Sequence, residues 1–220
     1  MKKIKTVLFD LDGTLADTAP DLAGALNHVL KSHNYDPLPN ETIRPHVSHG
    51  GVALTTLGFG KDHPDFDDIY KELLARYESN IADETVLFDG MNELLVELEE
   101  NGMNWGVVTN KPAWLTDPLM QALNLSSRAA TIVSGDTLTE RKPHPAPLLH
   151  ACEQAGSKPS ECIYIGDAER DIEAGNRAGM PSIVALFGYI AESDKPNSWG
   201  AHASINHPQE IISIINALNS

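Results

Sequence analysis

One short stretch constrains this chain more than any other: FDLDGTL at residues 9–15. The apolar run before it, residues 4–9, predicts a buried strand, and two aspartates follow at the end of that strand. Because residues two apart in an extended chain point the same way, Asp10 and Asp12 should face one spot. Like charges ~4 Å apart repel by about 4 kcal/mol at an effective dielectric of 20. The pair therefore indicates a bound cation or a shared proton, unless the stretch is only a carboxylate-rich turn.

Composition and charge exclude several classes of protein. The chain has 220 residues and a formal net charge of −15, whereas a nucleic-acid binder normally presents a basic face, so no nucleic-acid partner is expected. No apolar run reaches 18 residues, so no membrane partner is expected either. The two cysteines, Cys152 and Cys162, do not form a disulfide framework, which favours a cytoplasmic location. A monomer or weak dimer is expected.

The chain changes its pattern twice. Residues 16–85 carry apolar side chains at helical spacing, so they are predicted to be all-helical, with a polar, glycine-containing loop near residues 41–60. From residue 86 onward, short apolar strands alternate with helices, which predicts an α/β fold with a Rossmann-like parallel sheet covered on both faces. We expect a core of residues 1–15 and 86–220, and an inserted helical domain of residues 16–85 placed as a lid.

Polar side chains gather at four places along the predicted sheet. Three of the groups follow strands, and the fourth stands directly before a helix. They are Asp10, Asp12, Thr109, Asn110, Lys142, Asp167 and Asp171. Taken singly, each has a simpler explanation as a turn residue, a solvated lysine or a helix cap. Because ligands of open α/β sheets bind outside the carboxyl ends of the strands, we expect these groups to form one site.

The same residues carry a family resemblance. Asp10-Leu11-Asp12-Gly13-Thr14, Thr109-Asn110, Lys142-Pro143 and Gly166-Asp167 with Asp171 resemble the four motifs of haloacid-dehalogenase (HAD) superfamily phosphatases. The resemblance covers essentially the whole chain, and the helical insertion is similar to the C1 cap of that superfamily. Residues 87–91, 105–112 and 187–190 resemble the phosphoglycolate phosphatase group, and especially its branch that includes N-acetylmuramic acid 6-phosphate phosphatases.

The resemblance implies a mechanism that the chemistry of a phosphate monoester also requires. Mg²⁺ would be held by Asp10, Asp167 and the backbone carbonyl of Asp12. Asp10 would attack phosphorus to form an aspartyl-phosphate, and Asp12 would serve as general acid and then as general base. Asp171 would orient the neighbouring lysine or a water on the metal.

Further groups are expected to bind the substrate. The Thr109 hydroxyl and the Asn110 backbone N–H would bind phosphoryl oxygens, and Lys142 would neutralise their charge. Arg44, His49 and Gly50 of the lid are expected to contact the leaving group, unless their loop is only solvated.

We therefore expect a Mg²⁺-dependent phosphomonoesterase acting on a small phosphorylated substrate, similar to phosphoglycolate phosphatases. Two alternatives share the motifs: an N-acetylmuramic acid 6-phosphate phosphatase of cell-wall recycling and a phosphosugar mutase of the β-phosphoglucomutase type. A haloacid dehalogenase would not need the second aspartate, and a phospho-receiver domain would lack the helical insertion.

Overall fold

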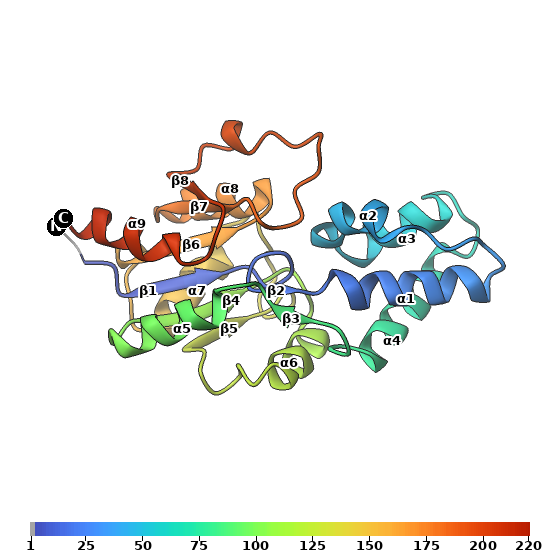
Figure 1. Ribbon diagram of the computed structural model, residues 1–220, viewed down its shortest axis with the longest axis horizontal. Coiled ribbons are helices and arrows are strands. Elements are labelled where there is room, and N and C mark those ends of the chain that lie inside the picture. The colour runs from blue at the N-terminus through green and yellow to red at the C-terminus, as the bar shows by residue number, and fades with distance from the viewer. Residues whose placement is uncertain (1–2) are drawn as a thin grey trace.

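A parallel sheet forms the larger part of the molecule. The computed structural model describes residues 3–220, and within them six strands form one parallel sheet in the order β5-β4-β1-β6-β7-β8 (Figure 1). These strands are β1 (Thr6–Phe9), β4 (Asn104–Val108), β5 (Thr131–Val133), β6 (Cys162–Gly166), β7 (Ser182–Ala185) and β8 (Ala203–Ile205). The predicted α/β fold is thereby confirmed, including the edge strand at residues 203–205.

Helices cover both faces of the sheet. Helices α5 (Met91–Glu100), α6 (Ala113–Ala122) and α9 (Glu210–Asn219) share one buried apolar cluster with Val7 and Phe9 of β1. Helices α7 (Ala146–Gln154) and α8 (Glu169–Ala178) share another with Leu8 and Tyr164. Because successive side chains of a strand point to opposite faces, β1 needs apolar residues at every position, as its sequence TVLF shows.

The cap is a separate helical layer at one end of the sheet (Figure 1). It comprises α1 (Ala19–Ser32), α2 (Asn40–Ile43), the 3₁₀ helix η1 (Arg44–His49), α3 (Gly50–Phe59) and α4 (Phe66–Ser79). Leu26, Leu54 and Leu73 from three of these helices are fully buried in a further apolar cluster, which Leu115 and Tyr189 join from the core. The expectation of a loop at residues 41–60 was wrong, because η1 and α3 fill most of that stretch.

Glycines made that stretch look irregular, although two of them serve helix packing. A Cβ on Gly58 would lie 3.1 Å from Leu26 and 3.2 Å from Leu30 of α1. A Cβ on Gly51 would lie 2.9 Å from both Tyr70 and Leu74 of α4. Glycine therefore lets α3 approach both neighbouring helices closely, and this packing offsets its low helix propensity.

Two short strands connect the cap to the core. β2 (Ala16–Asp17) pairs antiparallel with β3 (Val86–Leu87), so the chain leaves and returns at neighbouring points. Asp21, in the first turn of α1, accepts hydrogen bonds from the Glu84 and Thr85 amides and from the Thr85 hydroxyl. The two crossings are thus tied together on the cap side. Across residues 3–220, the helices are too short or too polar for any of them to cross a lipid bilayer.

Candidate active site

Three neighbouring strands bring the predicted motifs to one edge of the sheet. β1 lies between β4 and β6, and Phe9 is level with Val107 on one side and Ile165 on the other. The chain segments that follow these strands therefore emerge side by side. They carry Asp10, Thr109 and Asp167, all of which are buried.

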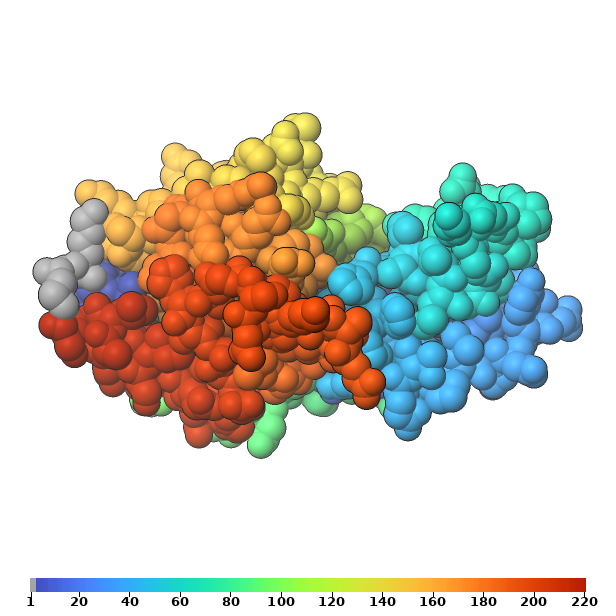
Figure 2. All heavy atoms as spheres, turned by 90° about the horizontal axis from the view of Figure 1, so that it is seen from above, coloured from blue at the N-terminus to red at the C-terminus, as the bar shows by residue number. Residues whose placement is uncertain are grey.

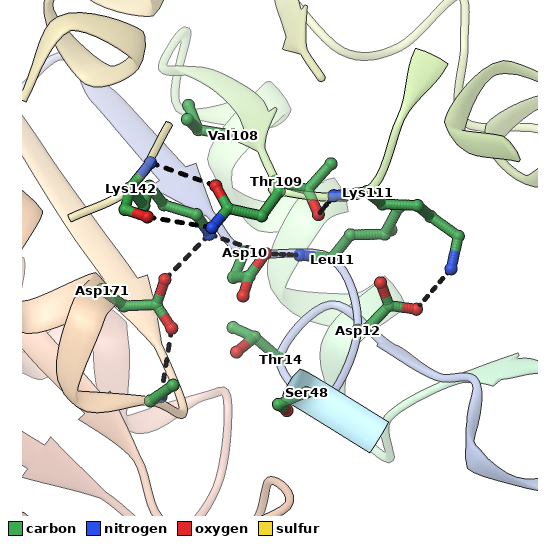
Figure 3. A network of polar contacts seen from close by, with 12 residues as sticks. Asp10, Leu11, Asp12, Thr14, Ser48, Val108, Thr109, Lys111, Lys142 and Asp171 are labelled. Carbon is green, nitrogen blue, oxygen red and sulfur yellow. Dashed lines mark hydrogen bonds and ion pairs between the residues drawn. The ribbon is translucent and has the colours of Figure 1, made fainter. Parts of the chain in front are cut away.

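Asp10 has one oxygen fixed and one available. Its Oδ1 accepts a hydrogen bond from the Leu11 amide at 2.7 Å and contacts Lys142 Nζ at 2.9 Å (Figure 3). Within residues 3–220, no hydrogen bond reaches Asp10 Oδ2, while the residue lines the cavity described below. Burial raises the pKa of the Asp10 carboxyl and outweighs the opposing effect of Lys142. This geometry leaves Oδ2 for attack on an electrophile.

Lys142 is a buried cation whose donors are all engaged. Its Nζ contacts Asp10 Oδ1 at 2.9 Å and Asp171 Oδ1 at 2.8 Å, and it donates to the Tyr164 hydroxyl at 2.8 Å. That hydroxyl donates in turn to the Val108 carbonyl at 2.8 Å. A buried charge is tolerated when it is paired and hydrogen-bonded, so this arrangement fixes the ammonium beside Asp10.

The side chain of Asn110 holds the backbone around Lys142. Its Nδ2 donates to the Lys142 carbonyl at 3.0 Å, and its Oδ1 accepts from the Lys142 amide at 3.1 Å. The sequence predicted a role for the Asn110 backbone only. The side-chain role depends on a segment 32 residues away and leaves no local signal in the sequence.

Three buried carboxyl groups meet at one point. Oxygens of Asp10, Asp167 and Asp171 lie within 4.8 Å of one another. Burial, followed by repulsion from Asp10 and Asp171, raises the pKa of Asp167 to about 7. Burial alone would raise the pKa of Asp171 as well, but Lys142 and Arg170 outweigh it and hold that pKa below its usual value.

This cluster fits a divalent cation. Lys142 contacts two of the three carboxyl groups, those of Asp10 and Asp171. The three groups together, when ionised, carry two more negative charges than this one ammonium group neutralises. Mg²⁺ carries the matching charge and prefers oxygen ligands from one or two carboxylates. Asp10 and Asp167 are the better candidates, because both oxygens of Asp171 are engaged, Oδ1 by Lys142 at 2.8 Å and Oδ2 by the Ala168 amide at 3.1 Å. Asp10 keeps Oδ2 available, and within the described part of the chain Asp167 Oδ1 accepts only a long bond of 3.4 Å from the Thr14 hydroxyl.

Asp12 lies beside the cluster with partners of its own. Its Oδ1 contacts Lys111 Nζ at 2.8 Å and accepts from the Thr18 hydroxyl at 2.6 Å. Lys111 also lies 4.5 Å from the centre of the Tyr77 ring, on the cap. Burial would lower the pKa of Lys111, but Asp12 and Tyr77 outweigh it and raise that pKa above its usual range. Lys111 follows the predicted Thr109-Asn110 motif directly, but its ion pair with Asp12 was not predicted from the sequence.

A cavity of about 470 Å³ lies between the core and the cap. The core side of its wall includes Asp10, Asp12, Thr109, Asn110 and Lys111, and the cap side includes Ser48, His49, Gly50, Val52 and Tyr70. His49 and Gly50 thus face the predicted site across the cavity.

Arg44 is placed differently from the other predicted residues. It is not among the residues that line the cavity. Its Nη1 donates to both Asp17 carboxylate oxygens at 2.9 Å, and its guanidinium carbon lies 4.7 Å from the centre of the Tyr189 ring. The structure therefore joins Arg44 to Asp17 of β2, in the pair of strands β2 and β3 that forms the hinge between cap and core, whereas a contact with the leaving group was expected.

The cap reaches the carboxyl cluster through Ser48. The Ser48 hydroxyl donates to Asp167 Oδ2 at 2.6 Å, and the Ser48 carbonyl accepts from Arg170 at 2.6 Å.

Gly13 has φ +82°, and a Cβ there would collide with the Asp167 carboxylate. Glycine is thus required where the loop after β1 turns against Asp167.

Comparisons with known proteins agree with this geometry. Residues 7–185 match the family model described as haloacid dehalogenase-like hydrolase. The chain is 40% identical over 215 residues to the N-acetylmuramic acid 6-phosphate phosphatase of Pseudomonas aeruginosa, covering 97% of this chain and 95% of that protein. It is 43% identical over 205 residues to a phosphoglycolate phosphatase of Xylella fastidiosa, covering 93% and 90%.

Solved structures share the whole architecture. A crystal structure from Haemophilus somnus, described as a predicted phosphoglycolate phosphatase, superposes with a TM-score of 0.86 at 26% identity. The match covers 97% of this chain and 99% of that one, so it includes both the sheet and the cap.

Proposed function

Because this chain belongs to the haloacid dehalogenase-like hydrolase family, we propose that it is a phosphomonoesterase that works through an aspartyl-phosphate on Asp10. The observation that carries the proposal is the Asp10 carboxylate. Lys142 and the Leu11 amide hold its Oδ1, and its Oδ2 is left for attack at the cavity. A carboxylate nucleophile beside fixed positive charge is suited to a dianionic phosphate ester.

The proposed reaction has two steps. Asp10 Oδ2 forms a bond to phosphorus, the bond to the leaving oxygen breaks, and Asp12 gives that oxygen a proton. Asp12 then takes a proton from a water molecule, whose oxygen attacks phosphorus and frees Asp10. The Thr109 hydroxyl and the backbone N–H of Asn110 would bind phosphoryl oxygens during both steps.

The proposal includes a bound Mg²⁺. Asp10, Asp167 and the carbonyl of Asp12 would hold the ion, which would supply positive charge against the phosphoryl oxygens. Asp171 would keep Lys142 in place through their 2.8 Å contact.

Two substrates are proposed, since relatives bear both names. A phosphoglycolate phosphatase activity is the first, and an N-acetylmuramic acid 6-phosphate phosphatase activity is the alternative. Both compounds carry a carboxylate, which suits Arg141 and Arg170 in the cavity wall. The volume of about 470 Å³ lies within the ≈ 300–1,000 Å³ range of small-molecule pockets, so the cavity has room for the bulkier sugar as well.

Phosphate release tests the proposal. The purified protein would be assayed with 2-phosphoglycolate, N-acetylmuramic acid 6-phosphate and glucose 6-phosphate, with Mg²⁺ or with EDTA. We expect release that EDTA abolishes and Mg²⁺ restores, and kcat/KM would rank the substrates. Absence of release from every ester would contradict the proposal. Phosphoryl transfer to a sugar phosphate with little release would instead favour the mutase.

We also propose the division into a core of residues 1–15 and 86–220 and a cap of residues 16–85. Residues 1 and 2 of that core lie outside the described residues. The pairing of β2 with β3 supports the division. A cytoplasmic monomer or weak dimer without a nucleic-acid partner remains our expectation, and light scattering after gel filtration would measure the oligomeric state.

A further inference from the structure

Tyr189 connects the carboxyl cluster with the hinge of the cap. Its backbone N–H donates to Asp167 Oδ2 at 2.9 Å. Its hydroxyl donates to Asp17 Oδ1 at 2.7 Å and accepts from the Ala19 amide at 2.9 Å. Asp17 belongs to β2 and Ala19 begins α1, so one residue binds the core, the hinge and the first cap helix.

The segment that carries Tyr189 lies against both parts of the molecule. In Figure 2 the orange-red chain after β7 lies against the blue cap, as the contacts of Tyr189 require. On the core side, a Cβ on Gly188 would collide with the Gly13 carbonyl and the Asp167 side chain. A displacement of this segment therefore disturbs Asp167 and the loop after β1 together.

Arg44 extends the connection into the cap. Its Nη1 donates to both oxygens of Asp17 at 2.9 Å, and its guanidinium lies over the Tyr189 ring at 4.7 Å. Arg44 thus recognises the hinge carboxylate and the core tyrosine at once. Such a stacked, paired guanidinium has a defined geometry that a mobile surface arginine lacks.

We propose that Tyr189 is a positioning residue that couples closure of the cap to the placement of Asp167. When Arg44 packs on the Tyr189 ring and Asp17 binds the Tyr189 hydroxyl, the Tyr189 amide is held against Asp167. An ion bound at Asp167 then stabilises the closed cap, and the closed cap stabilises ion binding by the same factor. The inference rests on the proposed function, because it takes Asp167 as a Mg²⁺ ligand.

The test compares Mg²⁺ binding and hinge protection in three variants without substrate. Tyr189→Phe removes only the hydroxyl. Arg44→Met removes the guanidinium from the Tyr189 ring and from Asp17, while Tyr189 and its hydrogen bond from the Ala19 amide remain. Arg128→Met is the matched control, because Arg128 also pairs with a carboxylate (Glu99, 3.0 Å) and lies over an aromatic ring (Trp105, 6.0 Å). Calorimetric titration with MgCl₂ measures the affinity, and amide hydrogen exchange measures protection at residues 16–19.

In the unmodified protein and in Arg128→Met, we expect Mg²⁺ to slow exchange at the Ala19 amide. In Tyr189→Phe and Arg44→Met, we expect this slowing to disappear and the Mg²⁺ dissociation constant to rise about fivefold or more, the usual lower bound of coupling between two sites. Arg44→Met carries the inference if Tyr189→Phe folds poorly.

Two results would overturn the inference, and only the second would also contradict the proposed Mg²⁺ site. If both variants bind Mg²⁺ like the unmodified protein, the coupling is absent while the proposed phosphatase stands. If the unmodified protein binds no Mg²⁺, the assignment of Asp167 as a ligand fails, and this inference fails with it.

Discussion

Replacing Asp167 with asparagine should change how the stability of the metal-free protein depends on pH. Burial and the neighbouring carboxyl groups raise the pKa of Asp167 from 3.8 to about 7. A carboxyl with a raised folded-state pKa binds its proton more tightly in the folded protein, so folding stability falls as pH rises from about 4 to about 7. Between about pH 5.5 and pH 7 this loss amounts to about 2 kcal/mol at 1.36 kcal/mol per pH unit. Asparagine does not titrate, so the variant does not undergo this pH-dependent loss of stability.

The measurement is thermal unfolding in EDTA at about pH 5.5 and about pH 8. The difference in Tm between Asp167→Asn and the unmodified protein should shift in favour of the variant by roughly 4–8 °C across this range, because 1 kcal/mol corresponds to ≈ 2–4 °C for a chain of this size. The hydrogen bonds from Ser48 and from the Tyr189 amide favour the ionised carboxylate, and their effect is already contained in the pKa of about 7. Asp62→Asn, at an exposed position, is the control. A Tm difference that does not change with pH would refute the electrostatic account of the cluster.

Three further substitutions test the proposed roles in turn. Asp10→Asn should abolish phosphate release and labelling of the protein by substrate phosphate, and detectable labelling would rule out Asp10 as the nucleophile. Asp12→Asn should lower kcat by about 10²–10⁴ in a phosphate-release assay, the usual contribution of a general acid–base, so a kcat within a few-fold of normal would remove Asp12 from that role. Lys142→Met leaves two buried carboxylates without their cation and should lower the free energy of unfolding in urea by about 3–5 kcal/mol; an unchanged midpoint would mean that the pair is compensated elsewhere.

The sequence was sufficient to predict the sheet and the grouping of its polar ends. Runs such as residues 162–165 are short and continuously apolar, which is typical of a parallel strand buried on both faces, and β6 spans Cys162–Gly166. The carboxyl ends of parallel strands necessarily meet at one edge. Asp10, Asp167 and Asp171 could therefore be grouped without knowing any distance.

Residues whose roles depend on distant partners could not be predicted in this way. Tyr164 lies inside an apolar strand, and nothing local shows that its hydroxyl accepts a hydrogen bond from Lys142. Arg44 lies in a polar segment that was expected to face the substrate, but its carboxylate partner, Asp17, is 27 residues earlier in the hinge. Tyr189 also donates a hydrogen bond to Asp17, although the two residues are 172 positions apart in the sequence. Such roles follow from tertiary contacts that periodicity does not encode.

The paired hinge strands have a consequence for protein engineering. Since β2 and β3 are hydrogen-bonded neighbours, the chain enters and leaves the inserted domain at points about 5 Å apart, the spacing of adjacent strands. A replacement module therefore needs two ends that lie this close together and an apolar surface that covers Leu115 and Tyr189, and it would have to replace the contact of Ser48 with Asp167. Transplanting whole modules at residues 16–18 and 85–87 would exchange the part of the cavity wall that the cap supplies and leave the sheet edge intact.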